Sequence, residues 1–480
     1  MTTSSPTSRL SSRARPVLAR SRARARAGGF TLIELAVALV GGLIVGIAVV
    51  GLSKEATNTF HEDMRAAQAQ FSVRTAIDRL RADVARAGFM ATPNIWGDPQ
   101  LVTPDYATAS MPTAPLNIQR MAGIRLFVSG SMKKANITGG FPTPSVGGTD
   151  ETSAFSANNN LTPDALDITG NMNTVEQYTV QTIGPGIGCG GGTRLYLAVE
   201  NPPAWRLLNG AGSDGGGSVD TLKRAFIPVA SERFALRLQD AQGRVQYLEA
   251  CDAGITPGTP PQPYVDVSGT IQILNTGTGS GSGKKTAGGE TGFFSGSQIN
   301  PVLTVRYKLS TPHAMYADLN PGGGDAGVDS RFDLYRYYIN TAGAEVGTPD
   351  LIAEYAVDLK FAFSVDNTAT GAPNPPPLDR TQVTYPFDDA TNNAKYGGPT
   401  AGVVDVFGPQ RIRSVRIRLA TRTAVADRAT AVAPPAFTPA DYTNLLRYCT
   451  TPTLPCGGFA RVRTVITEVN LNNIARGSYP

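Results

Sequence analysis

The segment from residue 30 to residue 52 is the feature that most limits how this chain folds. It reads FTLIELAVALVGGLIVGIAVVGL and contains a single charged residue, Glu34. About 20 consecutive apolar residues are enough for a helix to span the hydrocarbon core of a bilayer. We therefore expect a transmembrane helix close to the N-terminus.

The leader before this segment predicts its orientation. Residues 1–29 contain seven arginines and no acidic residue, and cytoplasmic flanks of membrane helices are rich in Lys and Arg. Of the 43 basic residues, 36 remain after these seven are removed, against 38 acidic residues, so the formal charge of +5 falls to about −2. Nucleic-acid binding requires a basic face on the folded body, and this balance does not call for one.

Two glycines distinguish this N-terminus from an ordinary secretory signal. In such a signal the cleavage site follows the apolar stretch, whereas Gly28 and Gly29 precede it and lie directly before Phe30. Cleavage at the glycine pair would leave the apolar helix on the mature protein.

The run Gly28-Gly29-Phe30-Thr-Leu-Ile-Glu34-Leu35 resembles the class III signal of prepilins, the precursors of type IV pilin-like proteins. The resemblance implies that a prepilin peptidase cuts between Gly29 and Phe30 and that Phe30 becomes N-methylated. It also equates Glu34 with the acidic residue at the fifth mature position.

Glu34 has a physical reason to be functional. A carboxylate inside an apolar span is costly and usually has a role, and cleavage creates an amine at Phe30 that is mostly protonated at neutral pH. In a stacked assembly, Glu34 of one subunit would pair with the amine of its neighbour and set the axial register. The alternative is that Glu34 lies at the membrane interface and complements the helix dipole.

The helix is expected to continue beyond the membrane as an amphipathic segment over residues 53–88. Apolar residues recur at spacings mostly of three and four, which predicts one buried stripe on a helix, and Gly88 is a suitable stop. The predicted stripe consists of Phe60, Met64, Ala67, Phe71, Ile77, Leu80, Val84 and Ala87.

Residues 89–480 predict a β-rich head, which makes the fold class α+β: a long helix packed on an antiparallel sheet with long Gly/Pro-rich loops. The predicted strands are Ile124–Val128, Arg194–Val199, Arg233–Leu238, Arg244–Leu248, Val302–Leu309, Leu334–Ile339, Leu359–Val365, Ser414–Thr421 and Arg461–Val469. Low-complexity stretches at Asn209–Ser218, Asn275–Ser297 and Asn367–Gln410 predict flexible loops.

Four cysteines, Cys189, Cys251, Cys449 and Cys456, are candidates for disulfides, since an even number in an exported domain favours them. Cys449 and Cys456 would close a small loop and Cys189 with Cys251 a long one. This is one of three connectivities, and free buried thiols are the alternative. No CxxC pair occurs and the chain has two histidines, so no zinc site and no other metal or cofactor is expected.

No catalytic residues are predicted, and we do not expect an enzyme. The run from Gly186 to Gly191 fits GxGxxG, but a strand-like segment follows it where a dinucleotide site needs a helix, so a turn is expected. Asp325, Asp329 and Asp333 are spaced by four; calcium needs several converging oxygens, and a solvated loop is the preferred interpretation.

Three further segments, residues 76–89, 350–361 and 411–419, are similar to parts of PilW-type minor pilins, which are related to the GspJ pseudopilins of type II secretion. The resemblance implies a minor pilin in the priming or tip complex that starts pilus assembly and presents an adhesin. Implied partners are other minor pilins, the major pilin, a PilY-type tip adhesin and the inner-membrane assembly platform. The precursor would lie in the inner membrane with its head in the periplasm, and the mature protein at the pilus tip on the cell surface. A GspJ-like pseudopilin and a membrane-anchored adhesin that never enters a filament are the alternatives.

The register hypothesis predicts the behaviour of a Glu34→Ala variant. We expect this variant to insert into the membrane, because the apolar segment is retained, but to enter filaments poorly, because the pairing partner of the neighbouring amine is lost. Immunoblots of membrane fractions and sheared filaments measure both quantities, and normal incorporation would contradict the hypothesis.

Overall fold

The apolar segment and the residues after it form one continuous helix, α1 (Leu32–Ala85), of 54 residues. At ~1.5 Å per residue, its length is roughly 81 Å. The helix ends three residues before Gly88, whose φ of +71° only glycine adopts at little cost. The N–H of Gly88 donates to the carbonyl oxygen of Thr169 at 2.9 Å, which ties the end of the helix to the sheet.

The structure is a computed structural model. It describes residues 31–98, 100–101, 115–128, 161, 163–190, 192–199, 217–256, 261–268, 271, 293–311, 331–367, 381–387, 389, 395–397, 408–425, 447–449 and 459–476. The chain divides into two compact units, Met1–His61 and Glu62–Pro480, and all strands belong to the second, larger unit.

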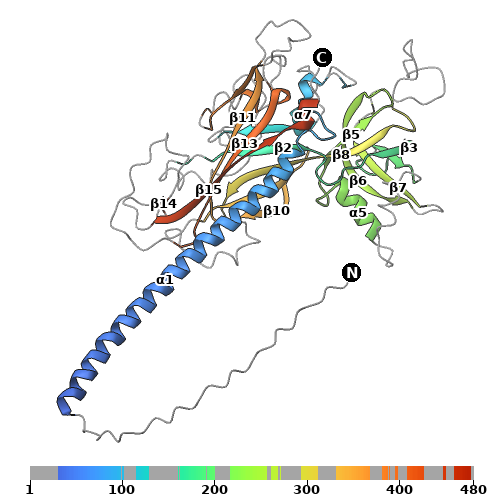
Figure 1. Cartoon of the computed structure of the whole chain (residues 1–480). Helices are drawn as coiled ribbons and strands as arrows, with labels where there is room; N and C mark the ends of the chain where they lie inside the picture. Colours follow the sequence, from blue (N-terminus) through green and yellow to red (C-terminus); the bar gives the residue numbers. More distant parts are fainter. Residues whose placement is uncertain are drawn as a thin grey trace, which may run out of the picture. The chain divides into compact units, whose positions relative to one another are not determined.

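The first sheet of the larger unit has ten strands, and every pairing between them is antiparallel. They are β1 (Ile124–Phe127), β2 (Ala165–Gly170), β3 (Tyr178–Pro185), β4 (Thr193–Leu197), β5 (Phe234–Gln239), β6 (Val245–Thr256), β7 (Gln262–Ser268), β8 (Gln298–Ser310), β9 (Asp333–Ile339) and β10 (Glu345–Ala353). Strand β8 organises this sheet. Its first half pairs with β3 and β5, which closes a ring in the order β8-β3-β4-β7-β6-β5, and its second half pairs with β2 and β9. In Figure 1 the ring strands are green to yellow.

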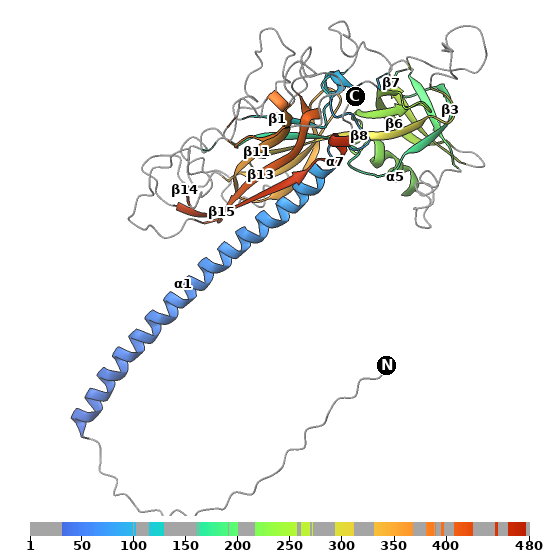
Figure 2. The same cartoon turned by 45° about the horizontal axis from the view of Figure 1, so that its top comes forward.

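The second sheet has five strands in the order β12-β11-β13-β15-β14, again all antiparallel. Its strands are β11 (Ala356–Asn367), β12 (Thr381–Thr384), β13 (Ile412–Arg422), β14 (Arg447–Cys449) and β15 (Phe459–Asn470). Figures 1 and 2 both show β15 alongside the second half of α1. Short helical segments complete the larger unit: η1 (Ile95–Gly97), α2 (Leu116–Gln119), α5 (Gly217–Phe226), η5 (Pro409–Arg411) and α7 (Asn472–Arg476).

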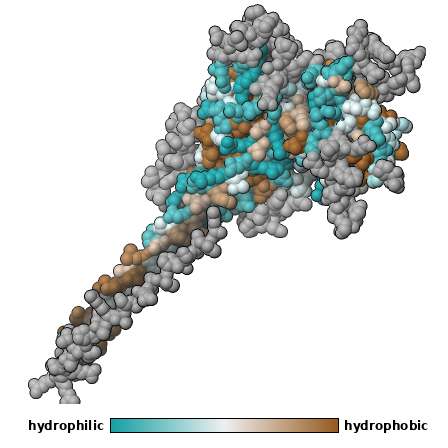
Figure 3. Space-filling view, turned by 45° about the vertical axis from the view of Figure 1, so that its right-hand side comes forward, coloured by the Kyte–Doolittle hydropathy of each residue, from teal (hydrophilic) through white to brown (hydrophobic). Residues whose placement is uncertain are grey.

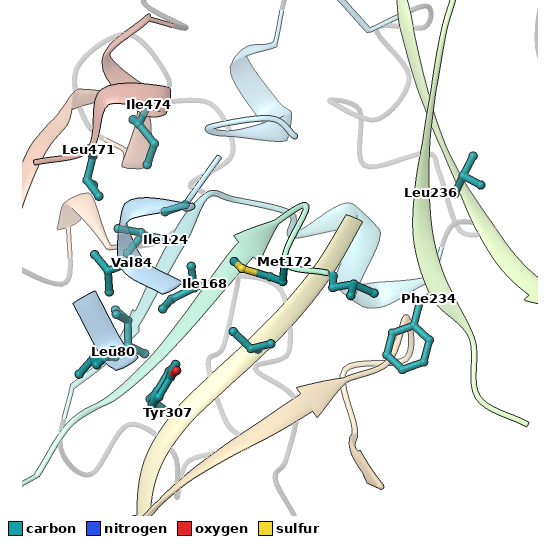
Figure 4. Close-up of a cluster of buried hydrophobic side chains, with 14 of the residues drawn as sticks. Leu80, Val84, Ile124, Ile168, Met172, Phe234, Leu236, Tyr307, Leu471 and Ile474 are labelled. Carbon is teal, nitrogen blue, oxygen red and sulfur yellow. The ribbon is translucent and has the colours of Figure 1, made fainter. Parts of the chain in front are cut away.

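The second half of α1 contributes to the core of the larger unit. Its buried residues are Ala66, Ala69, Val73, Ala76, Ile77, Leu80, Asp83 and Val84. Figure 4 shows Leu80 and Val84 near Ile168 of the first sheet, and a single hydrophobic cluster contains both helix residues together with Ile417 of the second sheet. The helix is therefore a shared packing partner of both sheets.

The prediction of the buried stripe is correct only for its second half. Ile77, Leu80, Val84 and Ala87 are buried. The earlier members are exposed: Phe60 at 62%, Met64 at 56%, Phe71 at 73% and Ala67 as well. At about 100° per residue, Phe71 lies about 200° around the helix from buried Val73. The earlier members thus form a separate apolar row on the opposite face, with the same spacings of three and four.

All nine predicted strands are confirmed, with shifts at their ends. The predicted loops are partly wrong, because α5 begins at Gly217 within one of them and β12 lies inside another. Most of the remainder of the three predicted loops lies outside the described residues. Six strands were missed, namely β2, β3, β7, β10, β12 and β14.

Truncating Leu80 tests the packing of α1. We expect Leu80→Ala to lower the free energy of unfolding by about 2–5 kcal/mol, because it leaves a cavity between the helix and the sheets. Phe71→Ala is the matched control on the exposed face and should change the free energy by less than about 0.5 kcal/mol. Denaturant titration of the full chain in detergent micelles measures both. Equal losses would contradict the assignment of the two faces.

Candidate functional site

Thr31 and Glu34 close the N-terminus of α1. The backbone N–H and the Oγ1 hydroxyl of Thr31 both donate to Oε2 of Glu34, each at 3.0 Å, and the N–H of Glu34 donates to Oγ1 of Thr31 at 3.3 Å. This reciprocal arrangement is a capping box. Glu34 thus stabilises the start of its own helix. This contact is compatible with the alternative to the register role, in which Glu34 acts at the helix terminus. Gly29 and Phe30 lie outside the described residues.

The first half of α1 is an apolar surface that the described part of the chain leaves exposed. Every residue from Leu32 to Leu52 is exposed, and α1 is the one helix in the described part of the chain that is long and apolar enough to cross a membrane. Figure 3 shows apolar residues, coloured brown, along the surface of the helix. Contiguous apolar surface of this extent marks a contact with lipid or protein. The segment is thus a candidate membrane anchor or signal sequence.

A groove of about 380 Å³ lies in the larger unit between the exposed row of α1 and the end of β10. Phe71 and Thr75 line it from the helix, and Leu351 and Tyr355 line it from the strand end. The Arg422 guanidinium lies 5.1 Å from the centre of the Tyr355 ring, a cation–π distance. The groove is therefore lined by apolar side chains and backed by Arg422, which is 2% exposed.

Asp83 joins α1 to the first sheet through buried polar contacts. Its Oδ2 accepts hydrogen bonds from the Tyr307 hydroxyl on β8 and from Nε of Arg336 on β9, each at 2.7 Å. Burial raises the pKa of the Tyr307 hydroxyl well above its usual value, and the Asp83 charge adds to this. Burial alone lowers the pKa of Arg336, but Asp83, together with Tyr307 and Tyr338, outweighs this effect, so the pKa is raised. Tyr307 therefore stays a neutral donor and Arg336 stays charged.

Asp83 was not identified from the sequence as a buried contact between α1 and the first sheet. The available signal was its place on the helix, since an acid three residues after Leu80 and four before Ala87 falls on the buried face. A buried carboxylate requires partners, and these come from strands more than 200 residues away in the chain. The sequence alone does not say which residues they are.

A second buried network lies within the first sheet. Asp167 of β2 is 1% exposed and accepts hydrogen bonds from Arg306 of β8 at 2.7 Å and from Nε of Arg125 of β1 at 3.2 Å. Arg306 is fully buried and also donates to Glu345 at 3.1 Å. Burial alone would raise the pKa of Asp167, but the charges of Arg306 and Arg125 outweigh it and lower the pKa.

One of the two predicted disulfides is present. Cys189 and Cys251 are bonded, with 5.8 Å between their Cα atoms, and the bond links the turn between β3 and β4 to β6. Next to it, Asp266 accepts two hydrogen bonds from Arg194, at 2.6 and 2.7 Å. The pair Cys449 and Cys456 stays a prediction, because Cys456 and the side chain of Cys449 lie outside the described residues.

The other two motifs of the sequence are the GxGxxG run and the aspartates spaced by four. Residues 186–190 of the GxGxxG run lie in the turn between β3 and β4, as predicted, and Gly191 lies outside the described residues. The solvated-loop expectation is wrong for Asp333, which is fully buried and pairs with Arg331 at 2.8 Å; Asp325 and Asp329 lie outside the described residues. Within those residues, no three or more His, Cys, Asp or Glu side chains gather closely enough to hold a metal ion.

Comparisons of the chain with known protein families, with curated proteins and with solved structures found no match.

The lowered pKa of Asp167 predicts a pH dependence. Asp167→Asn should lower the free energy of unfolding at pH 7 by about 3–5 kcal/mol, because it leaves buried arginines without their counter-charge. In the wild type, the stability from ionised Asp167 is present above the unfolded-state pKa of about 3.9 and is lost as pH falls through the folded-state value. The difference between the two proteins should thus narrow below about pH 4.

Denaturant titrations at several pH values measure this difference. Asp350→Asn is the control, since Asp350 is 54% exposed and pairs with Arg336, so its loss should cost less than about 1 kcal/mol. If the free energies of unfolding of the wild type and of Asp167→Asn differ by the same amount down to pH 2, Asp167 does not act through its charge.

Proposed function

We propose that this protein is a type IV pilin-like subunit whose α1 helix first anchors it in the inner membrane and then carries it into a filament. The observation that carries the proposal is the apolar half of α1. It follows the Gly28-Gly29-Phe30 processing signal, has Glu34 at the fifth position after the expected cut, and is left exposed by the rest of the described chain. Lipid and neighbouring subunit helices are the two environments that suit such a surface.

The contacts of α1 with the two sheets, one buried and one partly exposed, support a mechanical role for the helix. Asp83 ties the helix to β8 and β9, and Glu62 pairs with Arg461 of β15 at 3.0 Å. Because α1 is continuous, a force applied to its apolar half reaches these contacts without passing through a flexible linker. This is what a subunit extracted from a membrane by its helix requires.

Processing and register are assigned to three residues in this proposal. A prepilin peptidase cuts between Gly29 and Phe30, and Phe30 is N-methylated. Glu34 then accepts the N-terminal amine of a neighbouring subunit. Its capping contacts with Thr31 use Oε2, and Oε1 is the atom we assign to the neighbour.

The finer proposal is a PilW-type minor pilin in the priming or tip complex. The 480-residue chain supports a terminal position, because a bulky subunit repeated along a shaft would crowd its neighbours. The proposed partners are the other minor pilins, the major pilin, a PilY-type adhesin and the inner-membrane assembly platform.

Gene deletion with complementation tests the proposal. We expect the deletion strain to lose most surface filaments, because assembly lacks its initiating subunit. The amount of the other minor pilins in the sheared filaments should fall as well. Wild-type protein should restore both, and Glu34→Ala should restore little. Glu55→Ala is the matched control, since Glu55 is an exposed acid on the same helix, and it should complement fully.

Three outcomes would count against the proposal. Unchanged filaments and unchanged minor-pilin levels after deletion would exclude the priming role. Retention of the wild-type protein in the inner membrane, with none in sheared filaments, would indicate an anchored adhesin instead. Full complementation by Glu34→Ala would exclude the register role.

A further inference from the structure

Strand β15 has one paired edge and one edge that is mostly open. On one side it pairs with β13 from Val462 to Asn470 without a register shift. On the other side, β14 pairs with it only at Phe459, Ala460 and Arg461. Among the described residues, no strand lies against this second edge from Val462 onward.

Two hydrogen bonds at the ends of the β13–β15 pairing show which residues of β15 turn their N–H and C=O groups toward β13. The N–H of Thr423 donates to the carbonyl of Arg461 at 2.9 Å, and the N–H of Leu471 donates to the carbonyl of Arg413 at 2.8 Å. The odd-numbered residues of β15 therefore turn their backbone groups toward β13, and the even-numbered residues turn theirs the other way. The groups on the open edge belong to Val462, Thr464, Ile466, Glu468 and Asn470.

This edge lacks most of the features that usually prevent strand addition. Natural edges are shortened, bulged, or interrupted by proline or lysine. In this protein β12 is four residues long, and β10 has Pro349 and a register shift between Val346 and Asp350. β15 has no proline, lysine or bulge, and Ile466 is 43% exposed on it.

A symmetric pair of copies does not fit this edge. Arg461 contacts Glu62, and Nδ2 of Asn473, just after β15, donates to the carbonyl of Ala85 at 2.9 Å. Strand and helix thus run in the same direction. Two copies joined edge to edge by a two-fold axis would run their α1 helices in opposite directions, which two chains anchored in one membrane from the same side do not permit. This exclusion rests on the anchoring role proposed above.

We propose that the open edge of β15, Val462–Asn470, binds an extended segment of a partner protein as an added antiparallel β-strand. The edge already accepts an antiparallel strand, β14, at its first three positions. Its side chains are constrained by cross-strand pairing. A β-branched or aromatic residue lies opposite exposed Ile466, and a Lys or Arg lies opposite Glu468.

Hydrogen exchange resolved to single amides tests the edge on the full chain in lipid nanodiscs. In the free protein, the amides of Thr464, Ile466 and Glu468 should exchange at least about tenfold faster than those of Val465 and Thr467, since only the latter are hydrogen-bonded to β13. A synthetic nine-residue peptide of alternating Thr and Val, with Lys placed to face Glu468, should slow the even-numbered amides to the rate of the odd ones.

Two variants separate strand addition from nonspecific binding. Ile466→Pro removes an N–H that points to the open edge, so the ladder with β13 is kept, and peptide affinity should fall about tenfold while the melting temperature is retained. Glu468→Lys should weaken the Lys peptide and favour a matching Glu peptide.

Slow even-numbered amides in the free protein would show that the chain covers its own edge and would overturn the proposal. Unchanged exchange at saturating peptide would do the same. Both readouts use the isolated protein, so a failure of filament incorporation would leave them unaffected.

Discussion

The contact of Asp83 with Tyr307 and Arg336 is the interaction on which the position of α1 depends. A carboxylate that is 5% exposed is tolerated only where donors meet it, and here the donors come from two adjacent strands of one sheet. Leu80 and Val84 bury apolar surface against the sheets, but apolar packing alone permits small rotations of a helix about its own axis. The two hydrogen bonds select one rotation, and that rotation decides which row of α1 is buried and which remains available to partners.

The consequence is a helix with two different apolar faces. One is covered by both sheets, and the other, with Met64 and Phe71, is left exposed beside the groove that Tyr355 and Arg422 line. In the second sheet, no described strand lies beside the edge of β15 at Val462–Asn470, and this edge runs in the direction of the helix. In the larger unit, the exposed row of side chains and the strand edge thus follow the same axis.

Much of the fold was predictable because local patterns carry it. Period-two alternation identified strands such as β13 and β15, and the long apolar run identified the start of α1. Strands with weaker patterns, such as β2 and β7, were missed because Gly, Asp and Pro interrupt their alternation. The disulfide between Cys189 and Cys251 was chosen correctly among three connectivities, although no sequence rule brings residues 62 apart together.

The sequence by itself determined the apolar helix, its single acid at Glu34, the glycine pair before it and the antiparallel character of the head. These are local properties, set by hydropathy, period and charge over a few turns or strands. Only the tertiary structure decided which face of α1 is buried, because two rows share the same spacings and the choice depends on Tyr307 and Arg336, far away in the chain. It also decided which strand edge has no described strand beside it, since edges are defined by neighbours and not by the strand itself.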